Sequence, residues 1–245
     1  MALAGRAALA MWWDIAPQVR PDFEHWHAHE HFPERLAIPG FLRASRWQSA
    51  EGGEGTFVLY ELADHAVLRS PAYLARLNAP TPWSTRLMPH HRKMVRCQCH
   101  VLESRGGVTA RSALTIRLAP AAGSEARLRL GLRGLAESAC ARPGIAGLHL
   151  LRHEPPPMEA TAEQRLRGLA DDAAEWVLVA CGYDRAALAA LAHTGEGELG
   201  ERALVAMGAA AGPVHRHFDL AYAATAADVA GIAAAAAAPP AGPAA

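Results

Sequence analysis

The sequence carries no excess of charge of either sign. Its 24 Lys and Arg residues equal its 24 Asp and Glu residues, so the formal net charge is zero. A protein that holds nucleic acid or an anionic membrane surface by electrostatics normally shows a basic excess. We therefore predict no nucleic-acid partner and no membrane partner. Thirteen histidines nevertheless make the charge sensitive to pH near neutrality, because free imidazole titrates at about pH 6.5.

Cysteine is scarce, and its spacing does not form a known redox or zinc motif. The four cysteines are Cys97, Cys99, Cys140 and Cys181, with no C-x-x-C pair among them. Two residues apart on a strand, Cys97 and Cys99 share one face in poor geometry for a mutual disulfide. Free thiols and a reducing compartment are the expectation.

Long apolar runs and nucleotide or serine-hydrolase motifs are also missing. The N-terminal stretch MALAGRAALAMWWDI lacks the features of a signal peptide, and the alanines of the C-terminal tail are too weakly apolar for a spanning helix. No P-loop, G-x-G-x-x-G or G-x-S-x-G occurs. The chain is 51% hydrophobic, which is ample for a core. We predict a cytoplasmic protein.

The first half of the chain shows a βαββαβ pattern of hydrophobic residues. Proline-rich residues 79–92 are expected to form an ordered loop. The predicted strands cover residues 8–15, 40–49, 56–62 and 94–102, and the predicted helices lie at 21–33 and 64–78.

The second half repeats this order, which indicates an internal duplication. The turn Pro143-Gly144 echoes Pro39-Gly40, each between a helix and a strand, and residues 154–168 read as an inserted loop. We predict α+β architecture: two ferredoxin-like βαββαβ repeats packed sheet to sheet as an intramolecular α/β barrel, with helices outside and an enclosed space between the sheets. The predicted units are an N-terminal repeat at 1–104, a degenerate C-terminal repeat at 105–224, and an Ala/Pro-rich tail at 225–245.

The helix after Pro21 combines aromatic and ionisable residues on one face. At about 100° per residue, Phe23, Trp26, His27 and Glu30 share an arc, with His31 at its edge. Pro33 and Pro39 are expected to end this helix. A carboxylate and an imidazole on an otherwise apolar face indicate the wall of a pocket.

These residues resemble a known family. The motifs Trp26-His27-x-x-Glu30-His31-x-Pro33-Glu34-Arg35 and Ile38-Pro39-Gly40-Phe41, followed by Arg46, are similar to those of the dimeric α/β-barrel (ferredoxin-like) superfamily, near its EthD-like branch. Only the first half carries them, so the resemblance implies a site in that half. It also implies a pocket between sheet and helices for a small, often aromatic or oxygenated ligand. Relatives include small monooxygenases, lactone isomerases and haem-dependent enzymes.

Two side chains are candidates for chemistry. Glu30 and His31 could act as a general acid–base pair in a partly dry pocket. The alternative is structural: a buried ion pair between Glu30 and Arg46 that fixes the helix on the strand. Further side chains are expected to hold the ligand, with Trp83 as a lid. These ligand-binding candidates are Trp26, His27, Arg43, Arg46, Trp47, Tyr60 and Trp83.

The run His27-Ala28-His29-Glu30-His31 also fits H-x-x-E-H, a zinc-protease pattern. Because the resemblance accounts for Glu30 and His31 without a metal, we predict no metal and no cofactor. Binding of metal or haem through His27, Glu30 and His31 remains an alternative.

The expected function is that of a pocket protein that acts on a small oxygenated or aromatic metabolite as an EthD-like enzyme. Acid–base or cofactor-free oxygen chemistry would suit Glu30 and His31. A non-catalytic ligand-binding or stress-related protein is the alternative. Leftover sheet edges and one-sided helices would also permit a homodimer.

Overall fold

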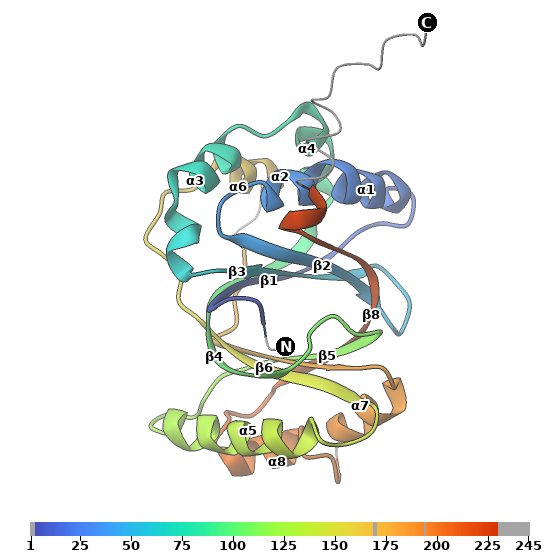
Figure 1. The fold of residues 1–245 in the computed structure, drawn as a ribbon, viewed down its shortest axis with the longest axis vertical. Coiled ribbons are helices and arrows are strands. Elements are labelled where there is room, and N and C mark those ends of the chain that lie inside the picture. Colours follow the sequence, from blue (N-terminus) through green and yellow to red (C-terminus); the bar gives the residue numbers. More distant parts are fainter. Residues whose placement is uncertain (1–2, 169–170, 194, 230–245) are drawn as a thin grey trace, which may run out of the picture.

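A closed antiparallel barrel forms the centre of the molecule (Figure 1). The computed structural model describes residues 3–168, 171–193 and 195–229. Within these residues, eight strands follow one another around the barrel in the order β1-β3-β2-β8-β5-β7-β6-β4. The strands are β1 (Ala7–Asp14), β2 (Phe41–Ser49), β3 (Gly55–Leu62), β4 (Arg92–Gly106), β5 (Ser112–Leu118), β6 (Ile145–His153), β7 (Trp176–Gly182) and β8 (Val214–Thr225).

Helices cover the barrel on two opposite sides (Figure 1). One layer holds α1 (Arg20–Trp26), α2 (Phe32–Leu36), α3 (Pro71–Asn78), α4 (Pro82–Leu87) and α6 (Ala162–Arg167). The other holds α5 (Glu125–Ala139), α7 (Arg185–Ala192) and α8 (Glu201–Met207). A π-helical segment (His27–His31) joins α1 to α2, and short 3-10 turns cover His65–Arg69 and Met88–His90. No helix of the described ranges is long and apolar enough to cross a membrane.

The predicted α+β barrel is confirmed. Each half of the chain supplies four neighbouring strands, in the orders β4-β1-β3-β2 and β8-β5-β7-β6, and the pairs β2–β8 and β4–β6 join the two sets. The predicted unit boundary at residue 104 falls inside β4, and most of the predicted tail lies outside the described residues.

Two segments predicted as loops contain short helices. Thr81 caps α4 by accepting a hydrogen bond from the backbone N–H of Ser84, with Pro82 at the first helical position. Thr161 and Gln164 form a capping box at the start of α6. Both are local signals for the start of a helix. They are missed when the prolines of these segments are read as evidence for loops.

Side chains fill the interior of the barrel, so the space expected between the sheets is occupied by packed residues. Both halves contribute to this core, which combines large residues with small ones, as a narrow barrel requires. Its members include Ala8, Ala10, Trp12, Trp47, Phe57, Leu59, Cys97, Cys99, Val179, Cys181 and Phe218. Two further cores lie between the barrel and the two helical layers.

A bulge in β2 changes which side chains face the helices. The register with β3 shifts between Phe41 and Arg43, so Phe41 joins the helix-side core while Trp47 enters the barrel interior. Strict alternation along residues 40–49 would place Phe41 and Trp47 on one face. They lie on opposite faces because a bulge adds a residue and reverses the alternation beyond it.

The two Pro-Gly turns have the same geometry. Gly40 and Gly144 have φ values of 96° and 90°. The carbonyl of Gly40 accepts a hydrogen bond from the N–H of Ala63 at 2.8 Å, and that of Gly144 accepts one from Tyr183 at 3.0 Å. Each turn therefore ties the end of a helix to the residue that directly follows a later strand, β3 in the first half and β7 in the second.

We expect Gly40→Ala and Gly144→Ala to destabilise the protein more than Gly52→Ala does. All three glycines have positive φ, but a Cβ at Gly40 or Gly144 would also collide with a neighbouring side chain, whereas none lies within 4 Å of a Cβ at Gly52. Backbone strain alone costs about 1 kcal/mol, and overpacking adds roughly 1–3 kcal/mol. Urea unfolding measures the difference, and equal losses for the three variants would contradict it.

Candidate functional site

A cavity of about 50 Å³ lies between the barrel and the helical layer of the first half. Its floor is formed by the helix-facing side chains of β1, β3 and β4, including Trp13 and Tyr60. The opposite wall comes from Trp26, His27 and His31. The volume holds a few water molecules and is smaller than the roughly 150 Å³ that a benzene-sized ligand occupies in an engineered cavity.

The π-helical segment explains how two histidines reach this cavity together. Pro33 has no N–H and would crowd the carbonyl four residues earlier in an α-helix. The preceding turn widens instead, and the N–H of Phe32 donates to the carbonyl of His27. The rings of His27 and His31 then stack, 5.4 Å between centroids and 18° between planes. From the sequence, Pro33 is expected to end the helix. The helical path instead continues through Pro33 to Leu36, the last residue of α2.

Five buried polar atoms around the cavity have no hydrogen-bond partner among the described residues. Most buried polar atoms in proteins have one, and each exception costs about 1–3 kcal/mol. The five atoms are Trp13 Nε1, His27 Nδ1, His31 Nδ1, Arg35 Nη1 and Tyr60 Oη. All five belong to residues that line the cavity, which indicates a place for a polar ligand beside them.

The imidazoles of this site are held neutral. Desolvation lowers the pKa of His27 well below 6.5, and the charge of Arg46 lowers it further. The pKa of His31 falls for the same reason, with a contribution from Arg35. Burial also lowers the pKa of His91 to about 4, although its Nδ1 lies 3.0 Å from the carbonyl oxygen of Met88. At neutral pH these rings act as proton acceptors or as hydrogen-bonding groups.

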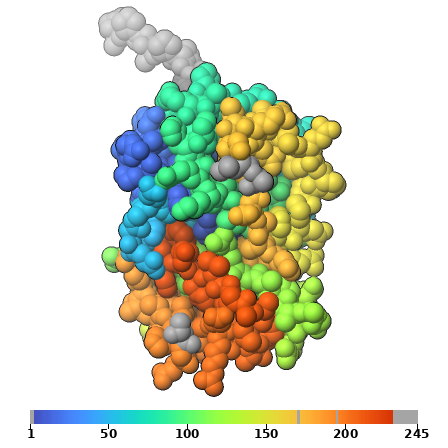
Figure 2. Space-filling model, turned by 180° about the vertical axis from the view of Figure 1, so that it is seen from behind, coloured from blue at the N-terminus to red at the C-terminus, as the bar shows by residue number. Residues whose placement is uncertain are grey.

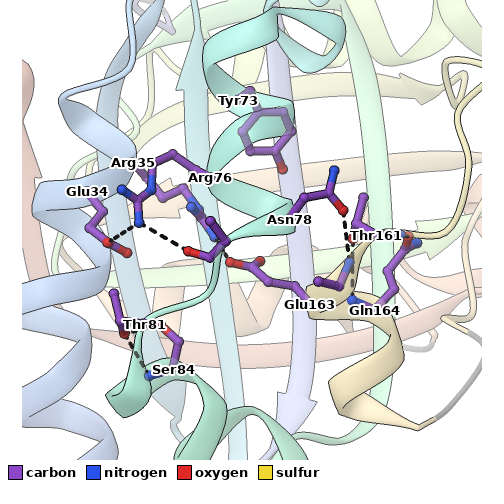
Figure 3. Close-up of polar contacts among 12 residues, drawn as sticks. Glu34, Arg35, Tyr73, Arg76, Asn78, Thr81, Ser84, Thr161, Glu163 and Gln164 are labelled. Carbon is purple, nitrogen blue, oxygen red and sulfur yellow. Dashed lines mark hydrogen bonds and ion pairs between the residues drawn. The ribbon is translucent and has the colours of Figure 1, made fainter.

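The second half of the chain closes the cavity. Helix α6 packs beside α3 and beside the 3-10 turn Met88–His90. Figure 2 shows yellow-orange residues of the second half in contact with green residues of the first half. Glu163 of α6 forms a buried ion pair with Arg35 of α2, and both side chains are less than a tenth exposed (Figure 3). Both halves therefore line the cavity, and α6 comes from the segment read as an inserted loop.

Glu30 lies behind the cavity wall. Its carboxylate accepts hydrogen bonds from Trp26 Nε1 at 3.0 Å and from the Thr81 hydroxyl at 2.5 Å. The alternative ion pair with Arg46 does not form, since Arg46 donates to the backbone carbonyl of Glu24 at 3.0 Å. Glu30 thus fixes the Trp26 ring and ties it to the start of α4.

Of the nine residues predicted for the site, four line the cavity: Trp26, His27, His31 and Tyr60. The other five lie elsewhere. Trp47 is in the barrel interior, Arg43 pairs with the buried Glu61, and Trp83 donates to Asp22 at 3.0 Å on the surface. Arg46 and Glu30 lie outside the lining as described above.

Several lining residues were not predicted. His91 and Arg96 follow α4 in the proline-rich stretch and in β4, and Glu163 comes from α6. Arg35 stood in the resembling motif without an assigned role. A capping box beginning at Thr161 was the available signal for the helix that carries Glu163.

The cavity does not suit the alternative cofactors. Among the described residues, no group of three or more His, Cys, Asp or Glu side chains could hold a metal ion. His27 and His31 face the cavity, but the carboxylate of Glu30 is engaged by Trp26 and Thr81. A haem needs several hundred Å³, far more than this cavity offers.

Comparison with known proteins identifies the fold. No protein-family profile matches the sequence, and no curated protein matches it. Among solved structures, an anthrone oxidase-like protein superposes with a TM-score of 0.59 at 12% identity, over 92% of this chain and 96% of that one. The chain has a ferredoxin-like barrel fold.

Two bacterial structures agree. A presumed monooxygenase of Fusobacterium nucleatum gives a TM-score of 0.58 at 8% identity, covering 91% of this chain and 95% of that one. Another from Lactobacillus acidophilus gives 0.57 at 9% identity, covering 91% and 97%. At such identities the likeness shows a common fold and does not extend to the reaction.

We predict that stability falls as the pH drops from 6.5 toward 4. A histidine with a lowered folded-state pKa binds its proton more readily in the unfolded chain, so acid favours unfolding. Each such residue adds a slope of about 1.4 kcal/mol per pH unit in this window. His91→Asn removes one titrating group while an amide can still donate to Met88. Urea unfolding between pH 7 and 5 should show a shallower slope for the variant, and parallel curves would contradict the prediction.

Proposed function

We propose that this protein binds a small oxygenated or aromatic metabolite in the cavity beside Trp26 and His31 and acts on it as an enzyme. Proton transfer, or cofactor-free oxygen chemistry that begins with proton removal, is the proposed reaction class, of EthD-like type. The observation that carries the proposal is that five unpartnered buried polar atoms belong to residues that line one cavity. Burial of this kind is typical of an acid–base site.

In this proposal His31 is the proton acceptor. Its Nδ1 is unpartnered, and the ring is neutral because desolvation lowers its pKa. A ligand hydroxyl that gives its proton to His31 becomes an anion beside the Arg35 guanidinium. The resulting imidazolium and the ligand anion then stabilise each other in a low-dielectric site. An electron-rich anion of this kind can react with dioxygen directly.

Glu30 has a positioning role in this proposal instead of a catalytic one. Its carboxylate holds the indole of Trp26 through Nε1, and that indole packs on the His31 ring with 4.4 Å between centroids. Loss of the carboxylate would free Trp26 to tilt and would change the shape of the cavity. The role of Trp26, His27 and Tyr60 is to hold the ligand.

An internal duplication accounts for the two sets of four strands. The equal φ values and equivalent hydrogen bonds of Gly40 and Gly144 support it. We propose residues 1–104 and 105–224 as the two copies, with membership of the EthD-like branch for the first. A homodimer remains a prediction, but the closed barrel supplies no free sheet edge among the described strands to support it.

A non-catalytic ligand-binding role is the second candidate. The two hydrogen bonds that Glu30 accepts from other side chains and the small volume of the cavity favour it, because a binding protein needs no solvent-exposed acid–base pair. Proton transfer to His31 separates the two candidates.

The test uses 4-nitrophenol, whose visible absorption reports its ionisation. We expect the bound probe to be more ionised than the free probe at the same pH, because His31 takes the proton and Arg35 stabilises the phenolate. His31→Ala should abolish the excess ionisation and weaken binding about tenfold. Glu30→Gln should weaken binding less and keep the excess ionisation.

His29→Ala is the matched control, since His29 lies on the same turn but is exposed and outside the cavity lining. Unchanged ionisation of the bound probe in the wild type would refute proton transfer and leave the binding role. Failure of the wild type to bind the probe at all would refute the proposed site.

A further inference from the structure

The charges around the cavity do not balance. Three guanidinium groups line it, those of Arg35, Arg96 and Arg167. Arg35 is paired with Glu163, and Arg167 makes two hydrogen bonds to the carboxylate of Asp171. Within the described residues, Arg96 has no carboxylate within 4.0 Å and donates only to the Tyr73 hydroxyl, at 3.2 Å. The cavity thus carries one positive charge in excess.

The unpaired guanidinium lies close to a second free donor. Arg35 lies over the ring of Tyr73, 5.9 Å from its centroid, and Arg96 contacts the hydroxyl of the same tyrosine. Arg35 also keeps Nη1 buried and unpartnered. Two cationic donors therefore flank one side chain, and guanidinium N–H groups match the geometry of a carboxylate better than any other side chain does.

The rest of the lining is apolar and adaptable. Met11, Met88, Met94 and Met158 face the cavity, four of the six methionines in the chain. Unbranched thioether side chains change rotamer at low cost and fit ligands of different shape. The small volume of the cavity can therefore grow around a ligand without a shift of the backbone.

We propose that the ligand of this cavity is a small organic monoanion, with its carboxylate between Arg96 and Arg35 Nη1 and its apolar body among the methionines. This inference rests on the proposed function, because it names the substrate class of the same cavity. His27, His31 and His91 are neutral and add no positive charge to the cavity at neutral pH. A ligand with a single negative charge therefore matches the one guanidinium left unpaired within the described ranges.

The experiment compares carboxylates with neutral amides of the same size. Acetate, propionate and benzoate are titrated into the full-length protein at constant pH and ionic strength, and acetamide, propionamide and benzamide serve as their partners. Trp13 and Trp26 line the cavity, so tryptophan fluorescence reports occupancy. We expect at least one carboxylate to bind about tenfold or more tightly than its amide.

Three variants assign the effect to Arg96. Arg96→Gln should bring the carboxylate to the affinity of its amide, while Arg96→Lys, which keeps the charge, should retain part of the preference. Arg92→Gln is the matched control, because Arg92 lies on the same strand, pairs with Glu54 and does not line the cavity. Its loss should leave the carboxylate preference unchanged.

Each outcome decides between the two proposals. Equal binding of acids and amides, or a preference that survives Arg96→Gln, would overturn the monoanion assignment. Binding of 4-nitrophenol without binding of any carboxylate would overturn it as well and leave the proposed function standing. If the wild type binds neither the carboxylates, the amides nor 4-nitrophenol, both proposals fail.

Discussion

Closure of the sheet is the constraint on which the rest of the molecule depends. The pairs β2–β8 and β4–β6 connect the strands of the two halves, so every strand of the barrel has two hydrogen-bonded neighbours. A closed ladder of eight strands encloses a space narrow enough for side chains to fill. Here Trp12, Trp47, Phe57 and Phe218 occupy that space, and the cavity beside Trp26 lies outside the barrel.

The two helical layers outside the barrel have different characters. Beneath α5, α7 and α8 the core consists mainly of aliphatic side chains, with Leu128, Leu132 and Leu188 fully buried. Beneath α1 and α2 the core contains aromatic rings and buried imidazoles. Leucines pack without polar demands, whereas indole, imidazole and guanidinium groups need partners. The cavity therefore lies in the layer of α1 and α2. Helix α6 belongs to the second half of the chain but packs in this layer and lines one side of the cavity.

The sequence allowed the barrel and the main wall of the site to be predicted, because both follow from periodicity. The alternation of apolar residues predicted the succession of strands and helices along the chain, and the arc of Trp26 and His27 pointed to the cavity. It did not allow the position of Glu30 or Trp47 to be predicted. A π-helical turn before Pro33 rotates the helix face, and a bulge after Phe41 reverses the strand face. Both are one-residue changes of register that periodicity cannot show.

The pairing of Arg35 with Glu163 could not be predicted from local sequence patterns, because the two residues are 128 positions apart. Breaking one partner of a buried ion pair leaves an uncompensated charge, so the pair holds α6 against α2. Yet the same guanidinium keeps one buried nitrogen, Nη1, without a partner among the described residues, and Arg35 lines the cavity. The Nη2 group of Arg35 thus holds α6 against α2 through Glu163. Its Nη1 group and the guanidinium of Arg96 give the cavity a positive potential. In the proposed site, negative charge on the ligand, whether present before binding or formed by loss of its proton, would compensate this potential and make the neighbouring neutral imidazoles more basic.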